Sequence, residues 1–311
     1  MATYTVKRLG YSLITLVFVS FAVFFLIHLI PGDPARVLLG VRATDESVRN
    51  IRHALGLDAS LLTQYGRFLG NLLHGDLGTS IRFQTSVFNL TIEHLLPTLF
   101  LIGYSVLISL AVAFPIGTIA ALRREKAADH VIRIGVITAI AIPAFWIGTL
   151  LIIVFSLKWS LLPASGYGST FGEHVKSLLL PAITLSLWQT GLLIRNLRSA
   201  VIDVLQLPYV DFARLRGLPP GVVLRRHVLR NSLASTVTIV GVNIGFLLAG
   251  AVVVENVFTI PGTGSLLVDT VFSRDYAIVQ GVTLVYAVLV IGINLLTDLT
   301  YPLLDPRVRL S

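Results

Sequence analysis

Residues 9–30 read LGYSLITLVFVSFAVFFLIHLI, an apolar run of 22 residues that decides the fold class. A helix of about 20 apolar residues crosses the roughly 30 Å hydrocarbon core of a bilayer. Lys7 and Arg8 precede the run, as they would in a cleavable signal peptide, but the apolar core of such a peptide is only about 7–15 residues long. The run also ends in Pro31-Gly32-Asp33-Pro34, which does not suit a cleavage site. We therefore predict an uncleaved first membrane span.

Five further apolar runs follow along the chain, at residues 97–122, 134–157, 178–194, 233–254 and 277–304. The composition agrees with them, since 55% of the 311 residues are hydrophobic and only 13% are charged, about half the charged share of a soluble domain. The sequence therefore predicts an all-α polytopic membrane protein with six transmembrane helices. The absence of cysteine excludes disulfides, Fe–S clusters, thiolate metal sites and cysteine nucleophiles.

The positions of Lys and Arg predict the orientation in the membrane. Fifteen of them lie in the N-terminus, the 123–133 and 195–232 loops and the C-terminus, whereas only three lie in the short loops 158–177 and 255–276. Because basic residues accumulate on the cytoplasmic side, both termini are expected there. The net charge of +8 is then mostly a signal of topology, and we expect no nucleic-acid partner.

Two connecting segments are too long to be simple links. The 31–96 segment is predicted to be an extracytoplasmic loop with helices at 46–55 and 61–73, since apolar residues recur there at helical spacing. We therefore divide the chain into an N-terminus with the first transmembrane helix (1–30), an extracytoplasmic loop domain (31–96) and a transmembrane core (97–311).

The second long connection, 195–232, lies between the fourth and fifth spans on the cytoplasmic side. From Arg198 it reads RSAVIDVLQLPYVDFARLRGLPPGVVLRRHVLRNSLAS. The pattern predicts a short helix at 209–216, a stop at Gly217 and a new helix begun at Pro219-Pro220. Composition leaves two interpretations open: an interfacial hairpin whose arginines contact lipid headgroups, or a docking element for a soluble partner.

This segment resembles a known motif. Asp211-Phe212-Ala213, three residues and then Gly217 are similar to the EAA-xxx-G motif of binding-protein-dependent ABC importer permeases. The chain departs from that motif with Asp in place of Glu, Phe in place of Ala, and Arg230 where a closing proline is usual. The stretch ARLRGLPP…VLRRHVLRN resembles the version found in the dipeptide/oligopeptide/nickel branch.

The resemblance extends over nearly the whole chain and is closest to the B-type subunit of that branch. It rests on the opening RLGYSLITLVFVSFAVFFLIHLIPGDPA, the outer segments QYGRFL and GDLGTS, VVVENVFTIPGTGSLLVDTVFSRDYAIVQG and the ending LLDPRVRL. The resemblance implies that this chain forms one half of a heterodimeric translocation pathway in a bacterial cell membrane. Such a pathway works by alternating access. The implied partners are a C-type permease subunit, two cytoplasmic ABC ATPase subunits or domains and an extracytoplasmic solute-binding protein.

The chain carries no G-x-x-x-x-G-K-[ST] phosphate loop, and its nearest approach, Gly262-Thr263-Gly264-Ser265, is interpreted as a glycine-rich turn. We therefore expect a non-catalytic subunit that binds no cofactor, with ATP and Mg²⁺ held by the ATPase partners. The seven histidines form no close pair, so no metal site is predicted.

Two groups of candidate site residues follow. The resemblance implies ATPase coupling by residues of the cytoplasmic loop: Asp211, Ala213, Arg214, Gly217, Arg226, His227, Leu229 and Asn231. Polar residues inside the spans either line the pathway or hydrogen-bond between helices: Gln189, Thr190, Asn243 and Asn294. Gly241-x-x-x-Gly245 allows a close helix approach, and Glu255, at an outer helix end, is expected to reach interfacial water or a structural partner.

The cargo is the least determined property. The spans contain few charged residues. This scarcity fits a peptide cargo, whose charges vary, better than it fits a site dedicated to one ion. Nickel or another small solute carried by the same architecture stays open. On topology alone, a secondary transporter or channel is also an alternative, although no inverted repeat points to one.

Overall fold

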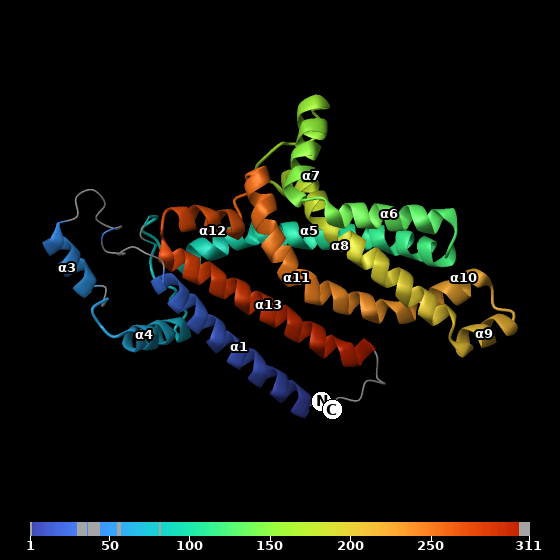
Figure 1. The fold of residues 1–311 in the computed structure, drawn as a ribbon, viewed down its shortest axis with the longest axis horizontal. Helices are drawn as coiled ribbons and strands as arrows, with labels where there is room; N and C mark the ends of the chain where they lie inside the picture. Colours follow the sequence, from blue (N-terminus) through green and yellow to red (C-terminus); the bar gives the residue numbers. More distant parts are fainter. Residues whose placement is uncertain (1, 30–35, 37–43, 55–56, 81, 305–311) are drawn as a thin grey trace.

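A computed structural model describes residues 2–29, 36, 44–54, 57–80 and 82–304 of the chain. Helices make up most of this part, and among the described residues the only pairing of extended backbone is an isolated bridge between Thr79 and Ser86. Most of the long helices run along the longest axis of the molecule (Figure 1). The predicted all-helical class is confirmed for the described residues.

Five uninterrupted helices are long and apolar enough to cross a membrane. They correspond to the first, second, fourth, fifth and sixth predicted spans: α1 (Ala2–Leu29), α5 (Val87–Leu122), α8 (Phe171–Leu205), α11 (Arg230–Phe258) and α13 (Tyr276–Leu304). The helices are longer than the apolar runs because polar residues continue them beyond the hydrocarbon. Pro97, predicted to start the second span, lies inside α5, which begins ten residues earlier.

The third span is not the single helix that the sequence predicted. It consists of α6 (Ala127–Ala141), then α7 (Ala144–Leu151) continued by the π-helix η2 (Ile152–Lys158), and the two parts are bent by 99°. Ile142 leaves the helix with ψ 130° immediately before Pro143. A proline ring disfavours helical backbone in the residue before it, which accounts for the break at this position. The count is therefore five uninterrupted candidate spans, or six if the bent pair crosses as one.

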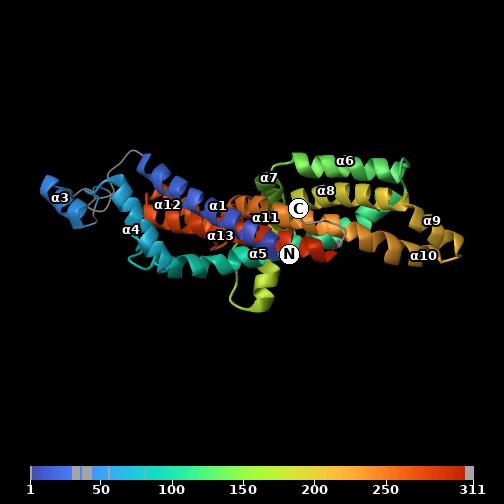
Figure 2. The same ribbon diagram turned by 90° about the horizontal axis from the view of Figure 1, so that it is seen from below.

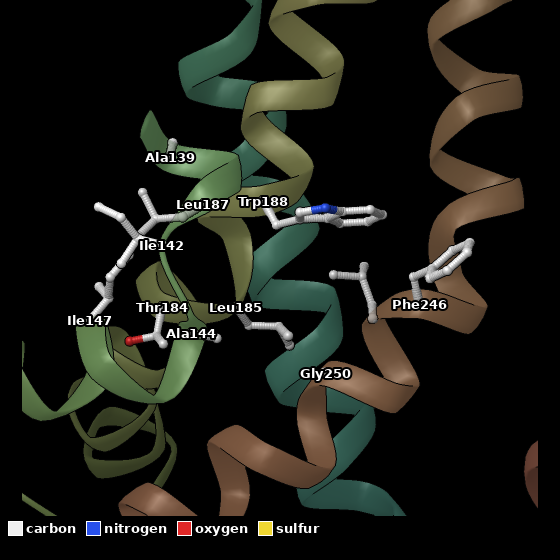
Figure 3. Close-up of a pocket in the computed structure, with 11 residues that line it drawn as sticks. Ala139, Ile142, Ala144, Ile147, Thr184, Leu185, Leu187, Trp188, Phe246 and Gly250 are labelled. Carbon is white, nitrogen blue, oxygen red and sulfur yellow. The ribbon is translucent and has the colours of Figure 1, made fainter. Parts of the chain in front are cut away.

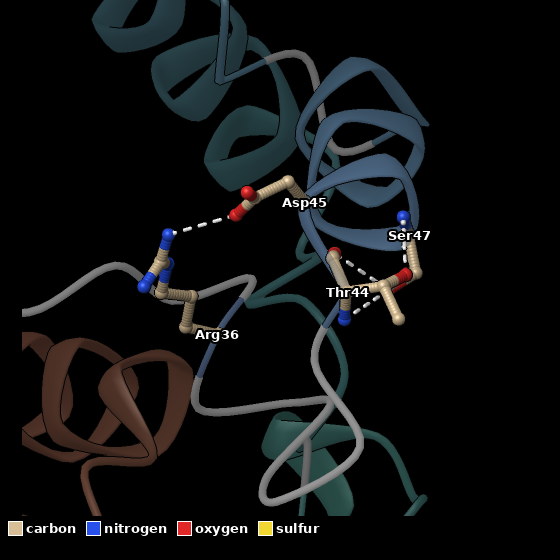
Figure 4. Close-up of polar contacts among 4 residues, drawn as sticks. All are labelled: Arg36, Thr44, Asp45 and Ser47. Atoms are coloured by element: carbon tan, nitrogen blue, oxygen red, sulfur yellow. Dashed lines mark hydrogen bonds and ion pairs between the residues drawn. The ribbon is translucent and has the colours of Figure 1, made fainter.

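The predicted outer loop holds two helices, α3 (Asp45–Ala54) and α4 (Leu61–Leu73), close to the predicted ranges. Thr44 begins α3: its Oγ1 accepts the Ser47 N–H at 3.2 Å, while the Ser47 hydroxyl accepts the Thr44 N–H at 3.0 Å (Figure 4). Figure 4 also shows Arg36 paired with Asp45 beside this turn, at 3.1 Å. α4 packs on α1, where the Tyr65 and Ser20 hydroxyls lie 3.0 Å apart.

A further helix, α12 (Thr263–Phe272), occupies the place of the predicted glycine-rich turn. Gly262 is its N-cap, and Gly264 lies in its first turn against α11, where a Cβ would come within 2.6 Å of Val252 Cα. Only a residue without a side chain fits so close to another backbone. The glycines that suggested a turn are thus needed for packing at the start of a helix.

Glu255 on α11 holds α12 in place, so of the two alternatives predicted for it, interfacial water or a structural partner, the structural partner is confirmed. Its side chain is fully buried; one oxygen accepts the Thr98 hydroxyl at 2.6 Å and the other the Ser265 N–H at 3.0 Å. Thr98 also accepts the Thr263 N–H at 2.9 Å, and the Thr263 hydroxyl lies 2.7 Å from that of Tyr286. This polar cluster ties α5, α11, α12 and α13 together.

The central helix of the molecule is α8. In its most apolar stretch 67% of residues are buried, against 17–33% in the other four uninterrupted candidate spans. Small residues let α5 approach it closely, since a Cβ on Gly117 would lie 3.2 Å from Leu197 Cβ. The close helix approach predicted from Gly241-x-x-x-Gly245 occurs between α11 and α13. A Cβ at Gly241 of α11 would overlap the Thr297 side chain of α13.

The 195–232 connection forms the end of the molecule opposite α12 (Figures 1 and 2). It contains the last turns of α8, then α9 (Pro208–Leu215), the single-turn α10 (Pro220–Val222) and the π-helix η3 (Val223–Leu229), which runs into α11. The predicted order of helix, glycine stop and new helix is confirmed.

Candidate coupling site at the end of the central helix

α8 carries the short helix α9 away from the membrane-spanning part of the chain. The apolar run predicted as the fourth span ends at 194, but α8 continues to Leu205. At 1.5 Å per residue, these eleven residues extend it by roughly 16 Å. α9 is therefore held beyond the apolar core of the bundle rather than at its edge.

One face of α9 is fixed to the rest of the molecule. Val210 and Ala213 are buried in a small apolar cluster with Val201 of α8 and Ala121 at the end of α5. The cluster is completed by Leu197, Val223 and Val228, and Leu229 packs against it. This cluster gives the coupling end a core of its own, so α9 is a fixed part of the structure.

The other face of α9 is exposed and partly apolar. Phe212 is 65% exposed and Leu215 82% exposed. Beside them, Asp211 and Arg214 form an exposed ion pair of 3.3 Å, one helical turn apart. Large apolar side chains in a polar rim, presented outside the membrane span, are characteristic of a protein-binding surface.

Gly217 ends α9 in the left-handed backbone conformation that glycine adopts readily. Its φ is +74°, its N–H donates to the Arg214 carbonyl at 2.9 Å, and the Leu218 N–H donates to the Ala213 carbonyl at 3.3 Å. This pair of bonds is the Schellman motif, which requires the left-handed conformation that glycine adopts without strain. No atom outside the glycine's immediate chain neighbours lies within 4 Å of an added Cβ there, so the constraint is conformational and not steric.

A polar contact joins α9 to η3. The Tyr209 hydroxyl donates to the His227 carbonyl at 3.2 Å, and the Asn231 amide donates both to that carbonyl, at 2.9 Å, and to the Tyr209 hydroxyl. Sequence reasoning missed Tyr209, because nothing local to α9 shows that η3 folds back beside it. Arg226 is exposed on η3 and lines a shallow basic hollow with Arg225 and Arg230.

The predicted coupling residues thus fall into different structural settings. Ala213 and Leu229 pack in the small core, Gly217 forms the turn, and His227 contributes its carbonyl to the contact with Tyr209. The remaining four have exposed side chains: Asp211, Arg214, Arg226 and Asn231.

The predicted pathway residues do not gather at one place. Gln189 is fully buried, and its amide makes no hydrogen bond. Thr190 and Asn243 donate to carbonyls of their own helices, Ser186 and Ile239, both at 2.8 Å. Asn294 is exposed. The structure of the single subunit therefore leaves their role open to experiment.

An apolar cavity of about 210 Å³ lies at the bend of the third span, between α6, α7, α8 and α11 (Figure 3). The Trp188 indole extends from α8 toward Phe246 on α11, and the two ring centroids are 5.4 Å apart. Ala139 and Ile142 line the cavity from the end of α6. Within the residues that the structure describes, no three His, Cys, Asp or Glu side chains are grouped to hold a metal ion.

The geometry is that of a multi-pass helical membrane protein with a short helix, α9, exposed at one end. Residues 113–310 match the family described as the binding-protein-dependent transport system inner membrane component, and residues 1–98 match its N-terminal membrane component. The chain belongs to this family of ABC transporter permeases.

Relatives along the full length carry transport names. The chain is 37% identical over 309 residues to the probable D,D-dipeptide transport system permease protein of Escherichia coli K12, covering 92% of this chain and 91% of that protein. It is 36% identical to a putative peptide transport system permease protein of Brucella abortus and 37% identical to the glutathione transport system permease protein of Salmonella paratyphi A, covering 99% of both chains in each case. The chain is thus a non-catalytic, multi-pass inner-membrane subunit that binds no cofactor, and ATP is handled by ATPase partners.

Proposed function

We propose that this chain is the B-type permease subunit of an ATP-driven importer of short peptides. It would form half of the translocation pathway beside a C-type subunit, receive cargo from an extracytoplasmic binding protein and dock two ATPase subunits or domains. The observation that carries the proposal is α9, which has one face buried in its own core and the other exposed with Phe212 and Leu215.

The position of α9 favours docking over an interfacial hairpin. A headgroup-binding hairpin lies at the membrane surface with its apolar face toward lipid. Here the inward apolar residues, Val210 and Ala213, are already covered by the protein, and α8 extends roughly 16 Å past its predicted span. The outward apolar residues therefore fit a groove on a soluble partner.

The coupling mechanism follows from this arrangement. ATP-driven closure of the ATPases would push on α9, and the continuous helix α8 would transmit that displacement into the centre of the bundle. Gly217 and the Tyr209–His227 contact keep α9 and η3 together, so that α8 and α11 receive the same push. The pathway would thereby alternate between inward-facing and outward-facing states.

This mechanism places the α9 end and both termini in the cytoplasm. The basic loops 123–133 and 195–232 support that orientation. The start of α1 and the end of α13 are the ends of these two helices that lie farther from α12 (Figures 1 and 2). A reporter that is active only outside the cytoplasm, fused after Leu304, should remain inactive.

The cargo proposal is supported by the relatives, whose names include peptide, D,D-dipeptide and glutathione transport. Titrating the cognate binding protein with dipeptides, longer peptides, glutathione and nickel chelates would identify the cargo. Peptide binding is the expected result, and exclusive binding of a nickel chelate would overturn the peptide assignment while leaving the permease role in place.

The coupling role is tested by Arg226→Glu in the complete transporter reconstituted in liposomes. We expect less cargo taken up per ATP hydrolysed, because Arg226 is exposed on η3, which lies beside the proposed docking helix α9. Arg67→Glu, an equally exposed charge reversal on α4, is the matched control and should leave the ratio unchanged. An unchanged ratio in Arg226→Glu as well would contradict the proposed contact of η3 with the ATPase.

A further inference from the structure

A part-buried ion pair, in which the Arg198 side chain is 21% exposed, joins the third span to the central helix just above the coupling site. Asp129, in the first turn of α6, is fully buried. Arg198 of α8 donates from Nε to one of its carboxylate oxygens at 2.7 Å and from Nη2 to the other at 2.6 Å. By contrast, the ion pairs made by Arg36, Arg52, Arg124 and Arg214 have both side chains at least 41% exposed.

The same carboxylate also closes the short connection between α5 and α6. Its Oδ2 accepts the backbone N–H of Glu125 at 3.0 Å, and Glu125 has the left-handed φ of +60°. One side chain therefore fixes the turn that follows α5, the start of α6 and the position of α8. Three elements are held at a single point.

The last turns of α8 contact two different parts of the molecule, each through a different face of the helix. Leu197 and Val201 face the apolar cluster that holds α9, whereas Arg198, about 100° further round the helix, reaches α6. A displacement of α9 acts on α8 through the first face. The second face then connects α8 to α6.

Stability alone is a poor reason for such a pair. Burying two charges costs about as much solvation free energy as their attraction returns, and apolar replacements are often as stable. What a bidentate arginine–carboxylate pair provides is a fixed relative geometry of the two elements that carry it.

We propose that Asp129 and Arg198 are a positioning pair that makes α6 move with α8 when the ATPases push on α9. α6 leads to the bend at Ile142-Pro143 and to the cavity at that bend, so the pair conveys the displacement to the place where the third span changes direction. This inference rests on the proposed docking of ATPases at α9.

The first test removes the pair without leaving an unpaired buried charge. In the double variant Asp129→Asn/Arg198→Met, the Asn side chain still accepts the Glu125 N–H. In the reconstituted transporter, we expect uptake per ATP hydrolysed to fall about fivefold or more. A change of about fivefold is the lower end of the range that typical coupling free energies between two sites produce. Arg198→Lys, which keeps the charge but not the two-point geometry, should give an intermediate ratio.

The matched control is Arg124→Gln, which removes an exposed charge from the same connection and should leave the ratio unchanged. The amount of assembled complex is measured for each variant, so that a folding defect is recognised. An assembled double variant with a normal ratio would overturn the proposal.

The second test measures the movement itself. Because the chain has no cysteine, spin labels can be placed at Val131→Cys on α6 and Asp203→Cys on α8, both exposed, in a complex whose other subunits lack cysteine. With the pair intact, the distance between the labels should be the same with and without bound nucleotide. In the double variant it should change, and a distance that stays constant there as well would contradict a role for the pair.

The two proposals fail in different ways. If Arg226→Glu lowers the uptake ratio but the Asp129/Arg198 variant does not, the docking site stands and the positioning pair falls. If neither variant affects the ratio, both proposals fail.

Discussion

The two ends of the molecule are built on opposite principles. At the α12 end, polar side chains are buried and bonded to one another, with Glu255 at the centre of contacts to Thr98 and Ser265. At the α9 end, a small apolar core supports a surface whose largest side chains, Phe212 and Leu215, are exposed. The first end is held by hydrogen bonds within the subunit, whereas the second, in our proposal, is completed by a bound ATPase. The difference predicts that mutations at the α12 end affect the stability of the subunit and those at the α9 end its association.

The largest effect is expected from Glu255→Ala. It leaves the Thr98 hydroxyl and the Ser265 N–H buried without their acceptor, which should lower the free energy of unfolding by at least about 2 kcal/mol. Thermal unfolding of the purified subunit in detergent measures this. Glu255→Gln retains an acceptor and should lose clearly less. Equal stability of Glu255→Ala and the wild type would show that the α12 end is not held by this cluster.

Leu215→Asp should leave the subunit stable, because the side chain is 82% exposed, but weaken binding of the ATPase about tenfold or more if it is an anchor of that interface. Co-purification at graded ATPase concentrations gives the affinity. Phe272→Asp, 84% exposed at the α12 end, is the matched control and should bind the ATPase normally. A loss of affinity in both variants, or in neither, would remove the proposed distinction between the ends.

The smallest effect is expected from Gly217→Ala. A Cβ meets open space there, so only the cost of a left-handed φ remains, about 1–2 kcal/mol. Gly221→Ala, also in open space but at an ordinary helical φ, should be neutral or slightly stabilising. Hydrogen exchange of the amides of α9 in the two variants compares them. Faster exchange in Gly221→Ala than in Gly217→Ala would contradict the role of the turn.

Local patterns predicted the features that depend on neighbours in sequence. Apolar length indicated five of the spans, and the spacing in 61–73 matched α4 to the residue. Gly217 marked the end of α9 because a helix stop of this kind needs a left-handed residue. The motif around Asp211 pointed to the coupling loop before its geometry was visible.

Features that depend on distant residues were wrong or absent. The third span was predicted as one helix, although Pro143 was present in it, because a proline can either bend a helix or be accommodated, as Pro97 and Pro181 are. Glu255 was expected to reach either interfacial water or a structural partner, and the sequence could not name that partner, because Thr98 and Ser265 lie 157 residues earlier and 10 residues later. Tyr209 and the Asp129–Arg198 pair gave no signal in the sequence, since their partners are 18 and 69 residues away.

The sequence by itself determined that this chain crosses a membrane, where most of its helices lie and where α9 ends, since these follow from apolar length and turn residues within a few positions of one another. Only the tertiary structure decided that α8 is the central helix, that α12 is locked by a buried carboxylate and that α6 is tied to the coupling end. Those properties arise from contacts between separate helices, whose free energy depends on burial and geometry that no local pattern encodes.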